Sequence, residues 1–353
     1  MAKVEKNNTV DPIVWYSENK NLFEQLSKKV ESILKEIIAD NSLAIHGIYS
    51  RSKEIDSFKE KIQDAKYKDP INQITDFAGI RIITYVESDL DKISKLVEEN
   101  FIIDTENSID KTKSLGIDKV GYRSAHYVAK LPENRTILAE YKKFFDLSFE
   151  IQIRTILQHA WAEIEHDKDY KFSGELPSHI KRRFKVLSGV LELADREFNL
   201  LATEIDNYQV EINEDTQSGN LNIEINSASV EAYMKNRFSK LYDEGKIDYT
   251  DTKELISELR NFDLDKIQEL DNILEDSLIE KILSFQDSNY TIAGILRSAM
   301  MTNNLEKYFS QAWKEEHWKM ITSDTYQLLK SENLPIDEYV QKYNLKLSPI
   351  NFL

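Results

Sequence analysis

The sequence predicts a mixed α/β fold, in which a β-sheet is flanked by helices, followed by an all-helical domain. Three observations support this prediction. Apolar and polar residues alternate strictly over residues 147–154 (LSFEIQIR), which is typical of a half-buried strand. A β-branched run at residues 75–86 predicts a second strand. Beyond about residue 222, nearly every segment has apolar residues at helical spacing.

The N-terminal half is expected to contain its elements in the order α–β–α–β–α–β–β–α. Apolar residues at helical spacing predict a helix over residues 13–40. A short strand, a turn and a helix follow between residues 44 and 62. After the strand at 75–86, the pattern predicts an amphipathic helix over residues 89–100.

The polar composition of residues 104–120 predicts a loop. Strands are expected at residues 121–131 and 147–154, and a long helix from Thr155 through Tyr170. A proline and a serine then precede another long helix, which is expected to end near Tyr208.

These patterns divide the chain into residues 1–210, a linker at 211–228 and a helical domain at 229–353. A turn signal, Ser218-Gly219-Asn220, lies within the linker. The helical domain also carries aromatic residues at helical spacing, which indicates a packed core rather than a binding surface. These residues, with a histidine among them, are Tyr308, Phe309, Trp313, His317 and Trp318.

The composition indicates a soluble globular protein of roughly two domains, since 41% of its 353 residues are hydrophobic and 31% are charged. We expect a cytoplasmic location and no membrane partner, because neither a signal peptide nor a long apolar run occurs. The absence of cysteine excludes disulfides and thiolate metal sites. A net charge of −16 argues against general nucleic-acid binding, and the nine glycines form no phosphate-binding loop motif.

Polar clusters occur at or beside the predicted strands, and together they suit a metal-dependent phosphoryl-type transfer. They are Arg51 and Lys53; Asp76 and Arg81; Tyr122, Arg123 and His126; and Glu150, Gln152 and Arg154. Asp76 and Glu150 offer the hard oxygen ligands that Mg²⁺ prefers, and Arg and Lys neutralise phosphates. Tyr122 offers a stacking face for a base. Taken singly, each has a structural explanation: Asp76 as a turn cap, Tyr122 as a half-buried residue and His126 as a core histidine.

Five motifs in this order resemble the synthetase domain of RelA/SpoT proteins, in its single-synthetase form. They are SRSK at 50–53, DFAGIR at 76–81, GYRSAH at 121–126, EIQIRT at 150–155 and HAWAEIEH at 159–166. The resemblance implies a nucleotidyltransferase-like fold. It also implies a Mg²⁺-dependent pyrophosphokinase, which transfers the β,γ-pyrophosphate of ATP to the ribose 3′-hydroxyl of GDP or GTP.

The resemblance assigns a role to each matching residue. It implies that Asp76 and Glu150 are catalytic and hold the metal, with Glu150 also facing the 3′-hydroxyl. The implied ATP-binding residues are Arg51, Lys53 and Arg81, and the implied acceptor-binding residues are Tyr122, His126, Gln152 and Arg154. His159 and Trp161 receive a supporting role.

Two departures from the family pattern affect these expectations. The family commonly has Asn-Gly-Tyr before the stacking tyrosine, whereas this chain has Val120-Gly121-Tyr122, which leaves the acceptor open between GDP, GTP and tRNA. Only about 40 residues precede the part of the chain that resembles the synthetase domain, which begins near Ala44. We therefore expect synthesis without the hydrolase domain of the long homologues.

Two alternatives to a free (p)ppGpp synthetase stay open. In the toxic branch of the family, some members modify the 3′-CCA end of tRNA, and in fused forms of this branch a C-terminal segment acts as the antitoxin. The basic run Lys181, Arg182, Arg183 and Lys185 would then contact the tRNA backbone, although it also suits a solvated helix face. The other alternative is a degenerate synthetase used as a binding module, against which the intact Asp76, Glu150 and Tyr122 argue. The family also suggests a homo-oligomer.

Overall fold

A computed structural model of the chain describes residues 11–110, 124–171, 176–248, 253–285 and 290–348. The chain divides into two compact units, residues 1–203 and residues 204–353. Each unit has its own hydrophobic core. No helix within the described ranges is long and apolar enough to cross a membrane.

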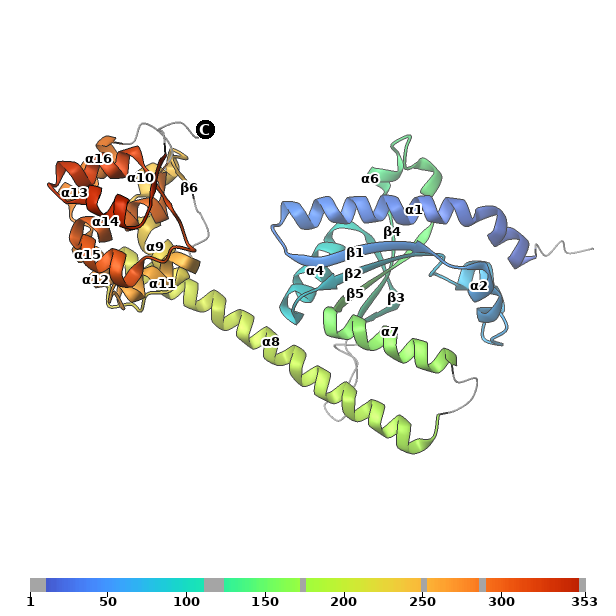
Figure 1. Cartoon of the computed structure of the whole chain (residues 1–353). Coiled ribbons are helices and arrows are strands. Elements are labelled where there is room, and N and C mark those ends of the chain that lie inside the picture. Colours follow the sequence, from blue (N-terminus) through green and yellow to red (C-terminus); the bar gives the residue numbers. More distant parts are fainter. Residues whose placement is uncertain (1–10, 111–123, 172–175, 249–252, 286–289, 349–353) are drawn as a thin grey trace, which may run out of the picture. The chain divides into compact units, whose positions relative to one another are not determined.

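The first unit is built on a mixed sheet, as the sequence predicted, and this sheet has five strands rather than the four that were expected (Figure 1). The strands lie in the order β1-β2-β5-β4-β3. β2 and β5 are parallel to each other, and the other three pairs are antiparallel. The strands are β1 (Ile45–Ser52), β2 (Ala78–Thr84), β3 (Ile102–Asp110), β4 (Ala125–Lys130) and β5 (Ser148–Thr155).

Helices cover both faces of this sheet, and the strands alternate accordingly. On one face, α1 (Pro12–Asp40) and α4 (Glu87–Asn100) bury apolar side chains against those of β2 and β5 (Figure 1). α7 (Ile156–Lys171) crosses the other face. In β5 every second residue is buried, from Phe149 to Thr155, and the residues between them are only partly covered. The predicted alternation is therefore confirmed, and it leaves a polar face beneath α7.

Short helices complete the connections of this unit. They are α2 (Ile55–Lys61), α3 (Pro70–Gln73), α6 (Glu133–Thr136) and the 3₁₀ turn η1 (Lys142–Phe144). α1 begins at a strong start signal, because the Asp11 side chain accepts a hydrogen bond from the Ile13 amide and Pro12 occupies the first turn.

The loop predicted at residues 104–120 was partly wrong, because β3 extends through Asp110. This strand lies at the edge of the sheet and contains an irregularity between Asp104 and Ile109. There the Asp104 carboxylate accepts hydrogen bonds from two backbone amides, and the Ser108 hydroxyl accepts one from the Val128 amide. Polar side chains thus supply hydrogen bonds at a bulge, which makes a paired edge strand look like a loop in sequence.

The end of the long helix near Tyr208 was also predicted too early. α8 runs from Ser178 to Ser218, so residues 211–218 of the expected linker are helical. Neither proline nor glycine occurs between Gly189 and Gly219, and apolar residues continue at helical spacing through Ile212. Gly219 has a φ of +82°, a conformation that glycine adopts readily and that commonly ends a helix. The basic side chains of residues 181–183 and 185 are exposed on α8.

The second unit is mainly helical, as predicted. Its described helices are α9 (Ser227–Arg237), α10 (Ser239–Asp243), α11 (Lys253–Asn261), α12 (Ile267–Ile273), α13 (Asp276–Phe285), α14 (Ile292–Asn303), α15 (Leu305–Lys307), α16 (Ser323–Ser331) and α17 (Ile336–Lys342), with a π-helical turn at Tyr308–Ala312. Four very short strands add two parallel pairs that periodicity did not reveal. They are β6 (Ile247–Asp248) with β7 (Tyr290–Thr291), and β8 (Met320–Thr322) with β9 (Lys346–Ser348).

A buried charge lies in the core of this second unit. Glu258 has no exposed surface, and its carboxylate is held by Arg297 through Nε at 2.8 Å and Nη2 at 2.7 Å. The Tyr308 hydroxyl, at 3.0 Å, and His317 Nδ1, at 3.1 Å, contact the same carboxylate. Tyr308 and Phe309 are buried, which confirms the core role predicted for the aromatic cluster.

Candidate active site

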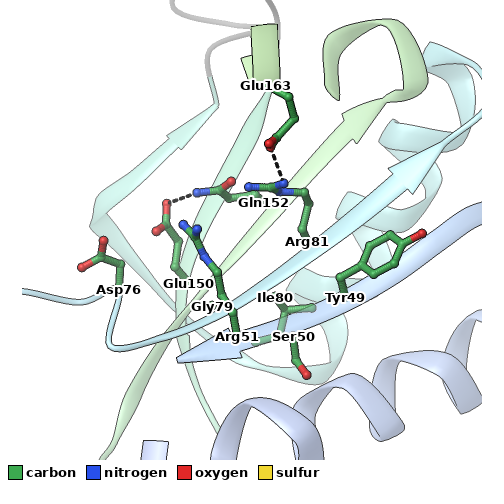
Figure 2. A pocket seen from close by; sticks show the side chains of 10 residues that line it. All are labelled: Tyr49, Ser50, Arg51, Asp76, Gly79, Ile80, Arg81, Glu150, Gln152 and Glu163. Atoms are coloured by element: carbon green, nitrogen blue, oxygen red, sulfur yellow. Dashed lines mark hydrogen bonds and ion pairs between the residues drawn. The ribbon is translucent and has the colours of Figure 1, made fainter. Parts of the chain in front are cut away.

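Strand register brings the predicted polar residues together on one face of the sheet. Glu150 pairs with Gly79 on one side and with Val128 on the other, and Gln152 pairs with Arg81 and His126. Because neighbouring strands keep their pleats in phase, side chains at these positions point to the same face. This polar face lines a cavity of about 150 Å³, shown in Figure 2.

Asp76 precedes β2 and forms one side of this cavity. Its Oδ2 forms ion pairs with Lys53 Nζ, 2.8 Å away, and with Lys61 Nζ, 3.0 Å away. Burial by itself raises the pKa of Asp76, but the hydrogen bonds and charges of the two lysines hold that pKa below its ordinary value of 3.8. Oδ1 is buried and has no hydrogen-bond partner among the described residues. Within the described residues, one oxygen of this ionised carboxylate therefore accepts no hydrogen bond.

Glu150 projects from the middle of β5 into the same cavity. His126 Nδ1 lies 3.0 Å from Oε1, and the Gln152 amide donates to the same oxygen at 3.3 Å. Burial raises the pKa of Glu150, yet the contacts with His126 and Gln152 lower it below its usual range. In the described part of the chain Oε2 receives no hydrogen bond, and Figure 2 shows it on the side of Asp76.

A larger cavity of about 390 Å³ adjoins the first, and basic side chains line both. Arg51 and Arg81 border the two cavities, and Arg154 borders the larger one. Cationic side chains around two adjacent hollows can neutralise a chain of phosphates, and planar guanidinium groups can bind phosphate oxygens in pairs.

α7 contributes a carboxylate that the sequence interpretation missed. Glu163 Oε1 accepts a hydrogen bond from Arg81 Nη1 at 2.7 Å, and Figure 2 shows it reaching the cavity from the side opposite the strands. His159 lies one turn earlier, with Nδ1 3.7 Å from Glu163. Burial and the nearby charge of Arg81 lower the pKa of His159. Because 159 and 163 are four residues apart, helical spacing in the HAWAEIEH motif was the signal that could have found Glu163.

The start of α7 is fixed by buried polar contacts. The Thr155 hydroxyl donates to Asp195 of α8 at 2.6 Å, and the Gln158 side chain accepts from the Thr155 amide at 3.0 Å. Burial raises the pKa of Asp195. Trp161 is buried against Phe184 of α8, which indicates a packing role. These contacts hold the helix that covers the polar face.

The structure thus brings together Arg51, Lys53, Asp76, Arg81, His126, Glu150, Gln152 and Arg154 of the predicted site. Lys61 and Glu163 join them without having been predicted. Tyr122 and Arg123 lie outside the described residues.

The residues present suit a magnesium ion even though, within the described ranges, no three His, Asp or Glu side chains form a metal-binding group. Mg²⁺ commonly takes only one or two protein carboxylates and completes its shell with water and substrate phosphates. Asp76 Oδ1 is buried without a hydrogen-bond partner in the described structure, the printed contacts of Glu150 involve only Oε1, and both residues line the same cavity.

Comparison with known proteins agrees with this geometry. Residues 50–175 match the profile described as the region found in RelA/SpoT proteins. The chain carries a RelA/SpoT region. That finding confirms the resemblance drawn from the five motifs, and the matched span includes every residue predicted for the site.

Two characterised relatives of this RelA/SpoT region come from Bacillus subtilis (strain 168). GTP pyrophosphokinase YjbM is 29% identical over 194 residues, which cover 53% of this chain and 86% of that protein. GTP pyrophosphokinase YwaC is 28% identical over 183 residues, covering 48% and 82% respectively. Among solved structures, small alarmone synthetase 1 from Bacillus subtilis aligns with a TM-score of 0.47 and 25% identity over 55% of this chain and 98% of that one.

Proposed function

We propose that the first unit is a pyrophosphokinase that transfers the β,γ-pyrophosphate of ATP to the 3′-hydroxyl of GDP or GTP, forming (p)ppGpp. The observation that carries the proposal is that two carboxyl groups with lowered pKa values, those of Asp76 and Glu150, line one cavity together with guanidinium groups. The RelA/SpoT region and the two relatives named GTP pyrophosphokinase support the same reaction.

In this reaction the 3′-oxygen attacks the β-phosphorus while the bond from that phosphorus to the α-phosphate oxygen breaks, and AMP leaves. Such a displacement depends on alignment and charge neutralisation rather than on a covalent enzyme intermediate. Arg51, Arg81 and Lys53 bind the triphosphate and hold the reacting groups in line. Glu150 Oε2 accepts the proton of the 3′-hydroxyl, because a ribose hydroxyl is a weak nucleophile until a base withdraws that proton.

Asp76 and Glu150 would hold Mg²⁺, whose charge, when bound, stabilises the phosphate oxygens as negative charge shifts to the leaving group. Lys53 and Lys61 keep Asp76 ionised and fix its orientation. Gln152, Arg154 and His126 lie on the strands beside Glu150, where the acceptor nucleotide would bind. We further propose that the protein synthesises without hydrolysing its product.

We also propose tRNA as a second possible acceptor, because the exposed basic residues of α8 could bind its phosphate backbone. Lys181, Arg182, Arg183 and Lys185 lie within five residues of each other, and a polyanion such as tRNA would bind such a run. Its 3′-terminal ribose would then replace GDP as the acceptor. Replacing Arg182 and Arg183 by Gln should weaken transfer to tRNA and leave transfer to GDP unchanged.

The test is to incubate the full chain with γ-labelled ATP and Mg²⁺, offering GDP, GTP and deacylated tRNA separately. Label in guanosine tetra- or pentaphosphate is the expected result, and label in tRNA alone would establish the second candidate. The matched controls are Asp76→Asn and Glu150→Gln, which keep side-chain size and remove the charge. Transfer at the unaltered rate in either variant would refute the proposed mechanism.

A further inference from the structure

The hydroxyl of Tyr16, on α1, reaches the segment that joins β1 to α2. The pairing of β1 with β2 ends at Ser52, although the Lys53 amide still donates to the Phe77 carbonyl at 3.0 Å. The Lys53 carbonyl accepts a hydrogen bond from the Tyr16 hydroxyl. Because a carbonyl oxygen can only accept, the direction of this bond is fixed. The fully buried Tyr16 thus supplies the donor that a main-chain carbonyl needs where the strand pairing ends.

The aromatic ring of Tyr16 contacts both segments that carry the lysine–aspartate cluster. Its centroid lies 4.8 Å from that of Phe77, the residue after Asp76, and 5.0 Å from that of Phe58 on α2. Phe58 and Phe77 are buried as well. Aromatic rings at these separations stabilise each other's placement. The ring therefore holds the hydroxyl at the Lys53 carbonyl, and Tyr16→Phe would retain these ring contacts.

The peptide group after Lys53 leads from the strand into α2, whose last residue is Lys61. The ammonium groups of these two lysines lie 2.8 Å and 3.0 Å from the same oxygen, Oδ2 of Asp76. The main chain can change direction here only by rotation about its two soft dihedral angles per residue. Rotation about the Cα–C bond of Lys53 would turn its carbonyl away from Tyr16 and swing α2 relative to β1. The hydrogen bond from Tyr16 opposes that rotation.

We propose that Tyr16 is a positioning residue, whose hydroxyl fixes the turn from β1 into α2 so that Lys53 and Lys61 meet on Oδ2 of Asp76. Two ammonium groups on one oxygen hold the carboxylate in a single orientation, in which Oδ1 has no hydrogen-bond partner among the described residues. The effect of Tyr16 on catalysis rests on the proposed pyrophosphoryl transfer. Its effect on the placement of α2 does not.

The first test compares the loss caused by Tyr16→Phe in the unaltered full-length protein and in Lys61→Met, by urea unfolding without nucleotide or metal. In the described structure no hydrogen bond or ion pair joins Tyr16 to Lys61. The two losses should therefore add if the hydroxyl only stabilises its own surroundings. If the hydroxyl places α2, the losses overlap. We expect Tyr16→Phe to raise the equilibrium constant for unfolding by a factor that is about twofold or more smaller in Lys61→Met.

Tyr127→Phe is the matched control, because it removes a buried hydroxyl elsewhere in the same unit. The Tyr127 hydroxyl, on β4, donates to Glu98 of α4 at 3.0 Å. Its loss should raise the unfolding constant by the same factor in both backgrounds. The second test is the kinetics of pyrophosphate transfer. The kcat/KM for ATP should fall about 10-fold in Tyr16→Phe, the lower end of the usual loss when a group that orients a functional side chain is removed, and change little in Tyr127→Phe.

Two results would overturn the proposal. One is an equal factor for Tyr16→Phe in the unaltered protein and in Lys61→Met. The other is a kcat/KM in Tyr16→Phe that is no lower than in Tyr127→Phe. Absence of transfer by the unaltered protein would instead count against the proposed function, and the unfolding comparison would still decide whether Tyr16 places α2.

Discussion

The ion pair between Lys53 and Asp76 allows a quantitative test of the site. Lys53 and Asp76 expose only 13% and 18% of their side chains, and their charged atoms lie 2.8 Å apart. Lys53→Met removes the charge while keeping most of the stem. The backbone at residue 53 should stay in place, since its carbonyl accepts a hydrogen bond from the Tyr16 hydroxyl on α1.

The expected loss in the free energy of unfolding is about 1–3 kcal/mol, the usual penalty for leaving a buried acceptor with an unmade hydrogen bond. It should not reach the roughly 3–5 kcal/mol of a fully isolated buried charge, because Lys61 remains 3.0 Å from the same oxygen. The matched control is Lys59→Met on α2, whose pair with Asp56 is exposed. Loss of that pair should cost about 0.2–1 kcal/mol.

The effect of Lys53→Met should also depend on pH. The pKa of Asp76 is lowered in the folded protein, so its ionised form stabilises the fold above its ordinary value of 3.8, and this stabilisation disappears as pH falls through the lower folded value. The difference between Lys53→Met and the unaltered protein should shrink over that acidic range. Urea unfolding followed by circular dichroism at neutral and acidic pH measures both effects. Equal losses for Lys53→Met and Lys59→Met, or a difference that persists in acid, would refute the reasoning.

Three further predictions follow from the described contacts. Mg²⁺ should raise the unfolding temperature of the unaltered protein but not of Asp76→Asn, measured by calorimetry, because Oδ1 of Asp76 would be a ligand. Glu150→Gln should lower kcat about 10²- to 10⁴-fold, the range for a lost general base, with an unchanged circular dichroism spectrum; a smaller loss would remove Glu150 from that role. Arg297→Ala should destabilise the second unit by about 3–5 kcal/mol, because it leaves Glu258 buried without its guanidinium partner. The control Arg237→Ala breaks a more exposed ion pair, with Asp276, and should cost under about 1 kcal/mol in the same urea titration.

Much of the sheet could be predicted because its pattern is local. In β5, burial on one face and polarity on the other repeat every two residues, and the polar set includes Glu150 and Gln152. β3 escaped prediction because Asp104 and Ser108 make hydrogen bonds that backbone groups make elsewhere. Composition alone does not distinguish such an edge strand from a loop.

The missed members of the site depend on tertiary structure. Lys61 lies at the C-terminal end of a short helix, and only the fold brings it to Asp76, 15 residues further along the chain. Helical spacing places Glu163 on the same side of α7 as His159, but only the fold brings that side of the helix to Arg81. Tyr16 lies on a helix that periodicity predicted, but its contact with Lys53, 37 residues further along the chain, becomes visible only when the fold is known.

The parallel pairing of β2 and β5 has a consequence for how activity arises during folding. Asp76 precedes one strand and Glu150 lies on the other, 74 residues later, so the two carboxylates share a cavity only after a long loop has closed. Loop closure costs entropy before any contact between the strands compensates for it, which makes non-local pairing slow. Partly folded chains that contain the helices and the local hairpins would therefore be inactive. In refolding experiments, the rate at which enzymatic activity recovers would therefore report the rate at which β2 pairs with β5.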